Sequence, residues 1–140
     1  MKVICGLIFN SKKQLLITQR SKGEYKGKWE FPGGKLEKNE NMEDCLKREI
    51  LEELDIQIDI KSIFMINEYD YPTFSVELIS YVCKYNDGKI KLIDHDRYEW
   101  IDINRLNEFD FLDGDKPIID KIKKIGVTKM FQIPPSITVE

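Results

Sequence analysis

The sequence has only one histidine, His95, among its 140 residues, and it has few cysteines. A single histidine excludes metal sites that need two imidazole ligands, and it leaves His95 as the only partner available to a serine or cysteine nucleophile. The three cysteines, Cys5, Cys45 and Cys83, are odd in number and far apart in the chain. They predict buried free thiols in a reducing compartment rather than a disulfide framework. We therefore expect any chemistry to depend on carboxylates.

Long apolar runs and an excess of basic charge are also missing. No stretch approaches the roughly 20 apolar residues that span a bilayer, and the apolar segment at residues 3–9 is too short for a signal-peptide core. The 22 Lys and Arg against 25 Asp and Glu give a net charge of −3, which argues against a nucleic-acid-binding surface. We expect a cytoplasmic protein that binds neither a membrane nor a nucleic-acid polymer.

The composition is typical of one folded domain. Hydrophobic residues make up 41% and charged residues 34% of the chain, and this length buries a sufficient core without disulfide or metal cross-links. β-branched and aromatic segments predict strands, and apolar residues three or four apart predict helices. The expected strands are residues 3–9, 14–20, 29–31, 62–69, 73–85 and 89–93, and the expected helices are 41–54, a short one near 103–108, and one opening at 115–117. This order predicts a layered α/β or α+β domain.

The first predicted helix carries three glutamates on one face. Asn41 is suited to cap its start, with Asp44 three residues further on. Glu49, Glu52 and Glu53 stand at positions i, i+3 and i+4, so their side chains share a face. A cation would relieve their mutual repulsion and their unfavourable position near the negative end of the helix dipole. A ligand set of oxygens alone favours Mg²⁺ or Mn²⁺, although a bare acidic cluster is also typical of a solvated helix face.

A longer pattern surrounds this cluster. Five residues separate Gly34 from Glu40, and seven more lead to the string Arg48-Glu49-Ile50-Leu51-Glu52-Glu53-Leu54-Asp55-Ile56. This pattern resembles the signature of the Nudix hydrolase family at every fixed position except Asp55, where the family has glycine. Because aspartate tolerates a left-handed backbone better than most residues, we expect the difference to concern only the end of the helix.

The resemblance implies a Nudix fold, in which a mixed β-sheet is sandwiched between helices and the loop–helix–loop motif lies at one edge. It implies a hydrolase of diphosphates linked to another group, with Mg²⁺ or Mn²⁺ held by the three helix glutamates and by the carbonyl of Gly33. One glutamate, in this cluster or in a later loop, would take a proton from the attacking water. Arg48 would hold the glutamates by hydrogen bonds, Glu40 would support the loop, and Gly33 and Gly34 would let the backbone turn beside the metal.

Two further segments indicate one branch of this family. The string Trp29-Glu30-Phe31-Pro32-Gly33-Gly34-Lys35 follows a strand that ends at Arg20, and Asp94 stands six residues before Trp100. These segments resemble the MutT-like and CTP pyrophosphohydrolase-like branch of the family. The resemblance implies that Arg20 and Lys35 bind substrate and that Asp94 reaches the metal site, with Glu99 as the alternative if the loop has another register. His95 is assigned no role.

A last segment concerns the base of a nucleotide. Asp115, in the string Phe111 to Ile119, matches the place where this branch has an asparagine that reads oxidised guanine or an aspartate in cytidine-preferring relatives. An ionised carboxylate only accepts hydrogen bonds, which suits the amino group of cytosine, whereas a protonated one also serves a purine. Alternatively, Asp115 only caps the last helix. Phe74, with Tyr71, would stack on the base, although aromatic residues in such strands are more often core.

The leading hypothesis is a Mg²⁺-dependent nucleoside triphosphate pyrophosphohydrolase that releases a monophosphate and pyrophosphate and cleanses the nucleotide pool. Cytidine nucleotides rank slightly ahead of oxidised guanine nucleotides such as 8-oxo-dGTP. The alternatives are hydrolysis of a nucleotide sugar or dinucleoside polyphosphate, and a nucleotide-sensing module without catalysis. We expect a Nudix domain at residues 1–126 and a C-terminal extension at 127–140, packed on the domain or at an interface, in a monomer or homodimer.

Overall fold

Strand β1 (Lys2–Phe9) is the centre of the sheet in the computed structural model, which describes residues 1–132. Its β-branched and aromatic residues make it a buried strand, and it pairs in parallel with β6 (Phe74–Asp87) along its whole length. On its other edge, β4 (Gly33–Lys35) pairs antiparallel with the first half of β1, and β2 (Leu15–Arg20) joins only at the far end. The two edge partners of β1 therefore diverge, and the gap between them is where the site lies.

The remaining strands extend the sheet on both sides. The order of the sheet is β3-β2-β1-β6-β5, with β7 paired to the open edge of β2. All pairs except β1–β6 are antiparallel. These strands are β3 (Trp29–Glu30), β5 (Gln57–Tyr71) and β7 (His95–Ile101).

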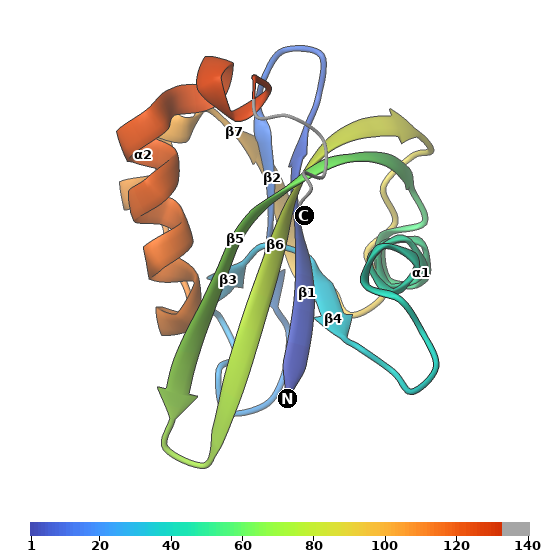
Figure 1. Ribbon diagram of the computed structural model, residues 1–140, viewed down its shortest axis with the longest axis vertical. Helices are drawn as coiled ribbons and strands as arrows, with labels where there is room; N and C mark the ends of the chain where they lie inside the picture. The colour runs from blue at the N-terminus through green and yellow to red at the C-terminus, as the bar shows by residue number, and fades with distance from the viewer. Residues whose placement is uncertain (133–140) are drawn as a thin grey trace, which may run out of the picture.

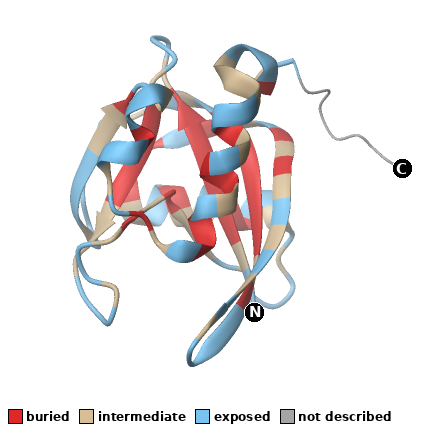
Figure 2. Ribbon diagram, turned by 90° about the vertical axis from the view of Figure 1, so that its left-hand side faces the viewer, coloured by how far each residue is buried: buried red, intermediate tan, exposed pale blue. Residues whose placement is uncertain are grey.

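Helices α1 (Met42–Leu54) and α2 (Lys116–Met130) lie on opposite sides of the sheet (Figure 1). Alternate residues of β1 supply the two cores, because successive side chains of a strand point to opposite faces. Ile4 and Ile8 belong to the core under α1, and Cys5, Leu7 and Phe9 belong to the core under α2. Buried residues follow the central strands, and the outer side of α2 is exposed (Figure 2). This arrangement confirms the predicted mixed sheet between helices.

Helix α1 begins and ends where the sequence predicts. The side chain of Asn41 accepts a hydrogen bond from the backbone N–H of Asp44 at 2.8 Å and caps the helix. Asp55 ends it in the left-handed conformation, with φ 59° and ψ 35°, which confirms that aspartate replaces the family's glycine there without loss of the turn. The predicted apolar stripe packs on the sheet through Leu46, Ile50 and Leu54.

Two predictions for the strands after α1 are wrong. Strands β5 and β6 form a longer ribbon than expected, with irregularities in register along β5 that let it bend. Residues 89–93 are not a strand, because their backbone bonds to the end of α1 instead. The N–H of Lys91 donates to the carbonyl of Leu54 at 2.9 Å, and the N–H of Ile93 donates to the carbonyl of Glu53 at 3.2 Å. These bonds satisfy carbonyls that the helix leaves unpaired.

The C-terminal part of the described chain packs on the same domain. Two short 3₁₀ helices, η1 (Ile103–Glu108) and η2 (Asp113–Asp115), precede α2, which has Pro117 in its first turn as predicted. Gly126 interrupts α2 with φ 78°, and Met130 beyond it is fully buried. The predicted extension from 127 onward is thus joined to the core as far as residue 132, and its residues 133–140 lie outside the described part. Within residues 1–132, no helix is long and apolar enough to cross a membrane.

Candidate active site

A cavity of about 600 Å³ lies where the edge partners of β1 diverge. Residues from the end of β2, from β3 and β4, from α1, from the start of β6 and from η2 line it. Nine of the twelve predicted site residues meet there although they are spread over almost the whole chain. They are Arg20, Gly33, Gly34, Lys35, Glu49, Glu53, Phe74, Asp94 and Asp115.

Two glycines let β4 pass close to its neighbours. A Cβ on Gly33 would lie 1.9 Å from the carbonyl oxygen of Ile4, because β4 packs against β1 at this point. A Cβ on Gly34 would lie 2.2 Å from the carboxyl carbon of Glu49. No side chain fits at either position without displacement of the backbone or of this glutamate. The two glycines are therefore required by the close approach of β4 to β1 and α1.

Glu53 is the most perturbed carboxyl group of the glutamate cluster. Burial, reinforced by the charges of Glu49, Glu30 and Asp94, raises the pKa of Glu53 to about 7, although His95 acts in the opposite direction. Its Oε1 is buried and has no hydrogen-bond partner among the residues that the structure describes. An ionised carboxylate oxygen left in this position is unfavourable unless a cation reaches it.

These residues fit a hard divalent cation. Glu49 and Glu53 on the cavity wall offer carboxylate oxygens, and oxygen ligands suit Mg²⁺ and Mn²⁺. In residues 1–132, no three acidic, histidine or cysteine side chains are already gathered around one point. The fit rests on the orphaned oxygen of Glu53 and on the carboxylate of Glu49 held against Gly34.

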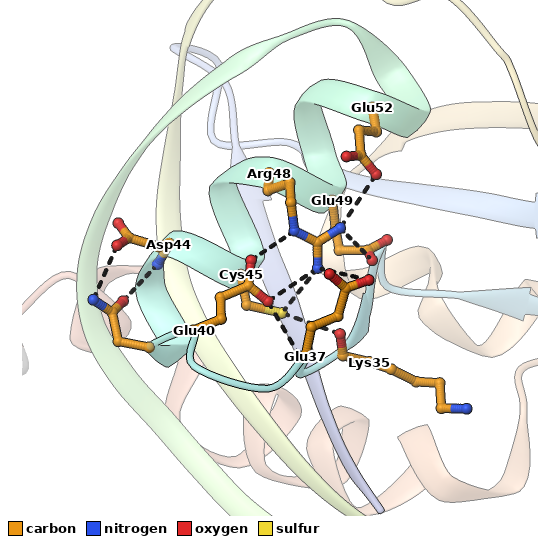
Figure 3. A network of polar contacts seen from close by, with 9 residues as sticks. Lys35, Glu37, Glu40, Asp44, Cys45, Arg48, Glu49 and Glu52 are labelled. Carbon is orange, nitrogen blue, oxygen red and sulfur yellow. Dashed lines mark hydrogen bonds and ion pairs between the residues drawn. The ribbon is translucent and has the colours of Figure 1, made fainter.

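Arg48 joins the loop before α1 to the glutamates of the helix (Figure 3). Its guanidinium donates to both oxygens of Glu40, at 2.6 and 3.1 Å, and to Glu49 at 3.1 Å. These hydrogen bonds with Arg48 lower the pKa of Glu40 to about 2. Glu40 also accepts the backbone N–H of Glu37 at 3.2 Å. The contacts are those expected of an arginine that holds the glutamates and of a glutamate that supports the loop.

Glu52 lies apart from Glu49 and Glu53 in this structure. Its side chain is 60% exposed, and it pairs with Arg48 at 3.2 Å instead of lining the cavity. The sequence placed all three glutamates on one helix face. The packing of α1 on the sheet turns only two of them inward, so metal binding by Glu52 stays a prediction.

A chain of polar contacts at one wall of the cavity was not predicted from the sequence. Glu30 accepts a hydrogen bond from Arg20 at 3.0 Å, and its other carboxylate oxygen lies 3.1 Å from Nε2 of His95. The side chain of His95, which had no predicted role, is only 5% exposed. Burial alone lowers the pKa of His95, but the hydrogen bond and charge of Glu30 outweigh it, and the pKa is raised. The one signal for Glu30 was its place in the string before Pro32.

The choice between Asp94 and Glu99 follows from the register of β7 on β2. Arg20 pairs with His95, which brings the preceding Asp94 to the cavity wall. The hydroxyl of Ser21 donates to the carbonyl of Asp94 at 2.6 Å and fixes this loop. Glu99 lies further along β7, pairs with Arg97 at 3.1 Å and is not on the cavity wall.

Asp115, at the start of α2, lines the cavity. It occupies the N-cap position but makes no side-chain capping hydrogen bond, so the alternative that it only caps the helix is wrong. The residue is 5% exposed, and its Oδ2 has no hydrogen-bond partner within the described chain. Burial holds the pKa of Asp115 well above its usual value, and the charge of Glu30 acts in the same direction. The backbone N–H of Phe31 and the charge of Arg20 act in the opposite direction but are weaker. A carboxyl group that keeps its proton both donates and accepts.

Aromatic side chains line the cavity beside Asp115. Tyr71 and Phe74 stack with ring centroids 4.9 Å apart and an interplanar angle of 23°. Tyr25, from the loop before β3, lies 5.3 Å from the ring of Tyr71 and also lines the cavity. Phe74 is 37% exposed, which corrects the general expectation that such aromatics are core. Tyr25 carried no recognisable signal in the sequence.

The order of these features along the chain matches a known family. The NUDIX domain family model covers residues 1–122. The chain belongs to the Nudix family. The Nudix loop and helix are therefore the Pro-Gly-Gly string, Glu40, Arg48 and the glutamates described above, and the resemblance noted in the sequence is confirmed.

Curated Nudix relatives are similar over nearly their whole length. The chain is 36% identical over 123 residues to the 8-oxo-dGTP diphosphatase of Buchnera aphidicola from Acyrthosiphon pisum, which covers 87% of this chain and 97% of the relative. It is 30% identical to the 8-oxo-dGTP diphosphatase of Escherichia coli, over 89% of this chain and 98% of the relative. The CTP pyrophosphohydrolase of Escherichia coli is 22% identical over 86% of this chain and 89% of that protein.

A solved structure supports the same fold. The MutT protein from Methanosarcina mazei Go1 superimposes with a TM-score of 0.80 at 23% identity, over 89% of this chain and 93% of that chain. This likeness confirms the predicted Nudix architecture.

Proposed function

We propose that this Nudix hydrolase is a Mg²⁺- or Mn²⁺-dependent nucleoside triphosphate pyrophosphohydrolase that releases a nucleoside monophosphate and pyrophosphate. One observation carries the proposal: the same cavity is lined by acidic groups suited to a cation and by an aromatic wall with a buried carboxyl group. The acidic groups, which we call the acidic end, suit a phosphate chain with its metal, and the aromatic wall with Asp115, which we call the base end, suits a base. The relatives at 36% and 30% identity are named 8-oxo-dGTP diphosphatases, which agrees with a nucleoside triphosphate as substrate.

Different residues of the cavity are suited to bind the phosphates, to hold the cation and to accept a proton. Arg20 and Lys35 supply positive charge for the phosphates, and Glu30 holds the guanidinium of Arg20 in place. A bound divalent cation supplies neutralisation of the phosphate oxygens and a more acidic water. Glu49 and Glu53, with the carbonyl of Gly33 and with Asp94, would hold it. Glu53 is also suited to accept a proton, because its pKa of about 7 lies close to neutral pH.

The base end favours oxidised guanine over cytosine. The sequence ranking placed cytidine slightly ahead because an ionised aspartate only accepts hydrogen bonds. The burial of Asp115 reverses this argument, since a protonated carboxyl group donates and accepts as an asparagine amide does. The relatives at 36% and 30% identity are 8-oxo-dGTP diphosphatases, whereas the CTP pyrophosphohydrolase is 22% identical. We therefore propose 8-oxo-dGTP as the preferred substrate, with cytidine triphosphates as the second candidate.

A substrate panel tests this function directly. The protein is incubated with Mg²⁺ and 8-oxo-dGTP, dGTP, dCTP, CTP, a nucleotide sugar or a dinucleoside polyphosphate, and pyrophosphate and orthophosphate are measured separately. We expect pyrophosphate from the triphosphates, loss of activity with a chelator, and a fall of at least about 100-fold in kcat for Glu53→Gln with its fold retained. Metal-dependent activity only on the nucleotide sugar or the dinucleoside substrate would replace the proposed substrate class, and nucleotide binding without turnover would leave a sensing module.

The remaining expectations belong to the same proposal. Cys5, Cys45 and Cys83 are all free and buried, which suits a reducing compartment, and we infer a cytoplasmic location. The predicted assembly is a monomer or a homodimer, without a membrane or a nucleic-acid polymer as partner. Gel filtration with light scattering distinguishes the two assemblies.

A further inference from the structure

Gly114, the residue before Asp115, is held on both sides by one strand. The hydroxyl of Tyr71 accepts the backbone N–H of Gly114 at 2.9 Å. The side-chain amide of Asn67 donates to the carbonyl of Gly114 at 3.1 Å. Only the NH₂ group of an asparagine can donate to a carbonyl, so this contact fixes the orientation of the Asn67 amide. Both partners come from β5, four residues apart along the strand.

The fit around Gly114 is too close for a side chain. A Cβ on Gly114 would lie 2.8 Å from the hydroxyl oxygen of Tyr71, whereas the next atoms, in Tyr71 and Tyr69, would lie at 3.5 and 3.6 Å. Of these atoms, only the hydroxyl oxygen of Tyr71 is close enough to oppose an added methyl group. The same tyrosine stacks on Phe74, so it contacts both the aromatic wall and η2.

No side-chain cap holds Asp115 at the start of α2, so the backbone of η2 bears on its position. Its side chain makes no capping hydrogen bond to its own helix, and its Oδ2 finds no partner in the described residues. The backbone of Gly114, fixed by Asn67 and Tyr71, sets where the carboxyl group of Asp115 enters the cavity. We propose that Asn67 and Tyr71 are positioning residues for base selectivity, acting through Gly114 to hold Asp115 at a set distance from the aromatic wall. This inference rests on the proposed function, because it requires that Asp115 faces the base.

Neither hydrogen bond reaches the acidic end of the cavity. Loss of either one shifts Asp115 relative to a bound base but leaves Glu49 and Glu53 in place. We therefore expect KM and selectivity to change, while kcat for the preferred substrate changes little. If Asn67 and Tyr71 only stabilise the fold, their substitution lowers the stability of the protein and leaves its selectivity between nucleotides unchanged.

The test compares Tyr71→Phe and Asn67→Ala with a matched control, Tyr69→Phe. Tyr71→Phe removes one oxygen and keeps the stacked ring. Tyr69 lies two residues before Tyr71 on the same strand. Its hydroxyl donates to the exposed carboxylate of Asp113 at 3.3 Å and, among the described residues, makes no hydrogen bond to the backbone of Gly114. We expect the ratio of kcat/KM for 8-oxo-dGTP to that for dCTP to change by about 5- to 10-fold in the two test variants, mainly through KM, and to stay within about twofold in the control.

A second measurement follows the hydrogen bond between Tyr71 and Gly114 in the absence of substrate. Amide hydrogen exchange at Gly114 is expected to become at least about tenfold faster in Tyr71→Phe, because the N–H loses its acceptor, and to be unchanged in Tyr69→Phe. Gly114→Ala supplies a further check, since the introduced methyl group meets the Tyr71 hydroxyl. Its effect on the ratio is expected to be smaller in combination with Tyr71→Phe than alone, a coupling that a double-mutant cycle measures.

The outcomes separate the two proposals. If the unaltered protein hydrolyses no nucleoside triphosphate, the proposed function fails and the positioning role fails with it. If it hydrolyses them and both test variants keep the ratio, only the positioning role is overturned. Unchanged exchange at Gly114 in Tyr71→Phe overturns it as well. A changed ratio with faster exchange in the test variants and neither in the control supports it.

Discussion

The carboxylate of Glu49 rests against the backbone of Gly34. A Cβ added to Gly34 would lie 2.2 Å from the carboxyl carbon of Glu49 and 2.3 and 2.6 Å from its two oxygens. On its other side the same carboxylate accepts a hydrogen bond from Arg48 at 3.1 Å. The hydrogen bond from Arg48 and the space that Gly34 leaves free therefore set the orientation of the Glu49 carboxylate.

A methyl group at Gly34 is expected to displace the Glu49 carboxylate. Gly34→Ala should lower kcat at saturating Mg²⁺ by about 100-fold and raise the Mg²⁺ concentration needed for half-maximal rate, since a small displacement of a ligand has a large effect on rate. Steady-state kinetics against Mg²⁺ and a thermal melt measure the two effects. Gly126→Ala is the control for a destabilising change away from the site, because nothing lies within 4 Å of the added Cβ but its φ of 78° disfavours alanine. It should lower the melting temperature and leave kcat unchanged. A Gly34→Ala enzyme as active as this control would contradict the contact.

The raised pKa of Glu53 predicts a pH-dependent stability of the metal-free protein. Because the folded-state pKa of about 7 lies above the unfolded value, the folded state binds more protons between about pH 4.5 and 7, and stability falls as the pH rises through this range. Glu53→Gln removes the buried charge. In the presence of a chelator it should be more stable than the unaltered protein by about 1–3 kcal/mol at pH 8, and the difference should shrink toward pH 5.

Urea unfolding at the two pH values measures this difference. Glu52→Gln is the matched control, because its side chain is exposed and should produce no such pH-dependent gain. Added Mg²⁺ should raise the melting temperature more at pH 8 than at pH 6, since the metal competes with a proton at Glu53. A Glu53→Gln protein that is less stable at pH 8 would show that the carboxylate is not an unfavourable buried charge.

The placement of Asp94 and Glu99 predicts opposite results for two similar substitutions. Asp94→Asn should increase the Mg²⁺ concentration for half-maximal activity by about 10-fold or more, because Asp94 lies on the cavity wall. Glu99→Gln should leave it within about twofold, since this side chain pairs with Arg97 on β7. Titration of the rate with Mg²⁺ decides between them. The reverse pattern would assign the fourth acidic residue to Glu99.

The burial of Asp115 predicts that an amide can replace it. Asp115→Asn should keep hydrolysis of 8-oxo-dGTP within about tenfold of the unaltered enzyme at pH 7, because the protonated carboxyl group and the amide have the same pattern of donor and acceptor. In the unaltered enzyme, deprotonation at higher pH removes the donor, so the preference for 8-oxo-dGTP over dCTP should decline with rising pH. This decline should be absent in Asp115→Asn. Profiles of kcat/KM against pH for both nucleotides measure it, and a loss beyond about 100-fold at pH 7 would indicate that the charge itself is required.

Much of α1 and its motif was predictable from the sequence because the determinants are local. Asn41 and Asp44 cap the start through contacts within one turn, and Asp55 ends the helix in a conformation that depends on its own backbone. The spacing of Glu49 and Glu53 places both on one side of the helix by its periodicity alone. The family pattern depends on the same local spacing, and the sequence was therefore sufficient to identify the loop, the helix and the Nudix resemblance.

Only the tertiary structure decided which of the candidate groups meet in the cavity. The direction in which α1 packs on the sheet turns Glu53 inward and leaves Glu52 with Arg48 at the surface. The register of β7 on β2 brings Asp94 and His95 to the cavity and places Glu99 outside it.

The tertiary structure also decided the conformation of the segment after β6 and the environment of Asp115. Residues 89–93 were predicted as a strand by their composition, but the carbonyls at the end of α1 bind their backbone instead. The burial that raises the pKa of Asp115 is likewise a property of the tertiary structure. The two hydrogen bonds from β5 to Gly114 join residues more than 40 positions apart. Local spacing thus determined the family and the acidic helix, whereas the pairing of distant strands determined which acids are buried, because burial disfavours the charged form of a carboxyl group and raises its pKa.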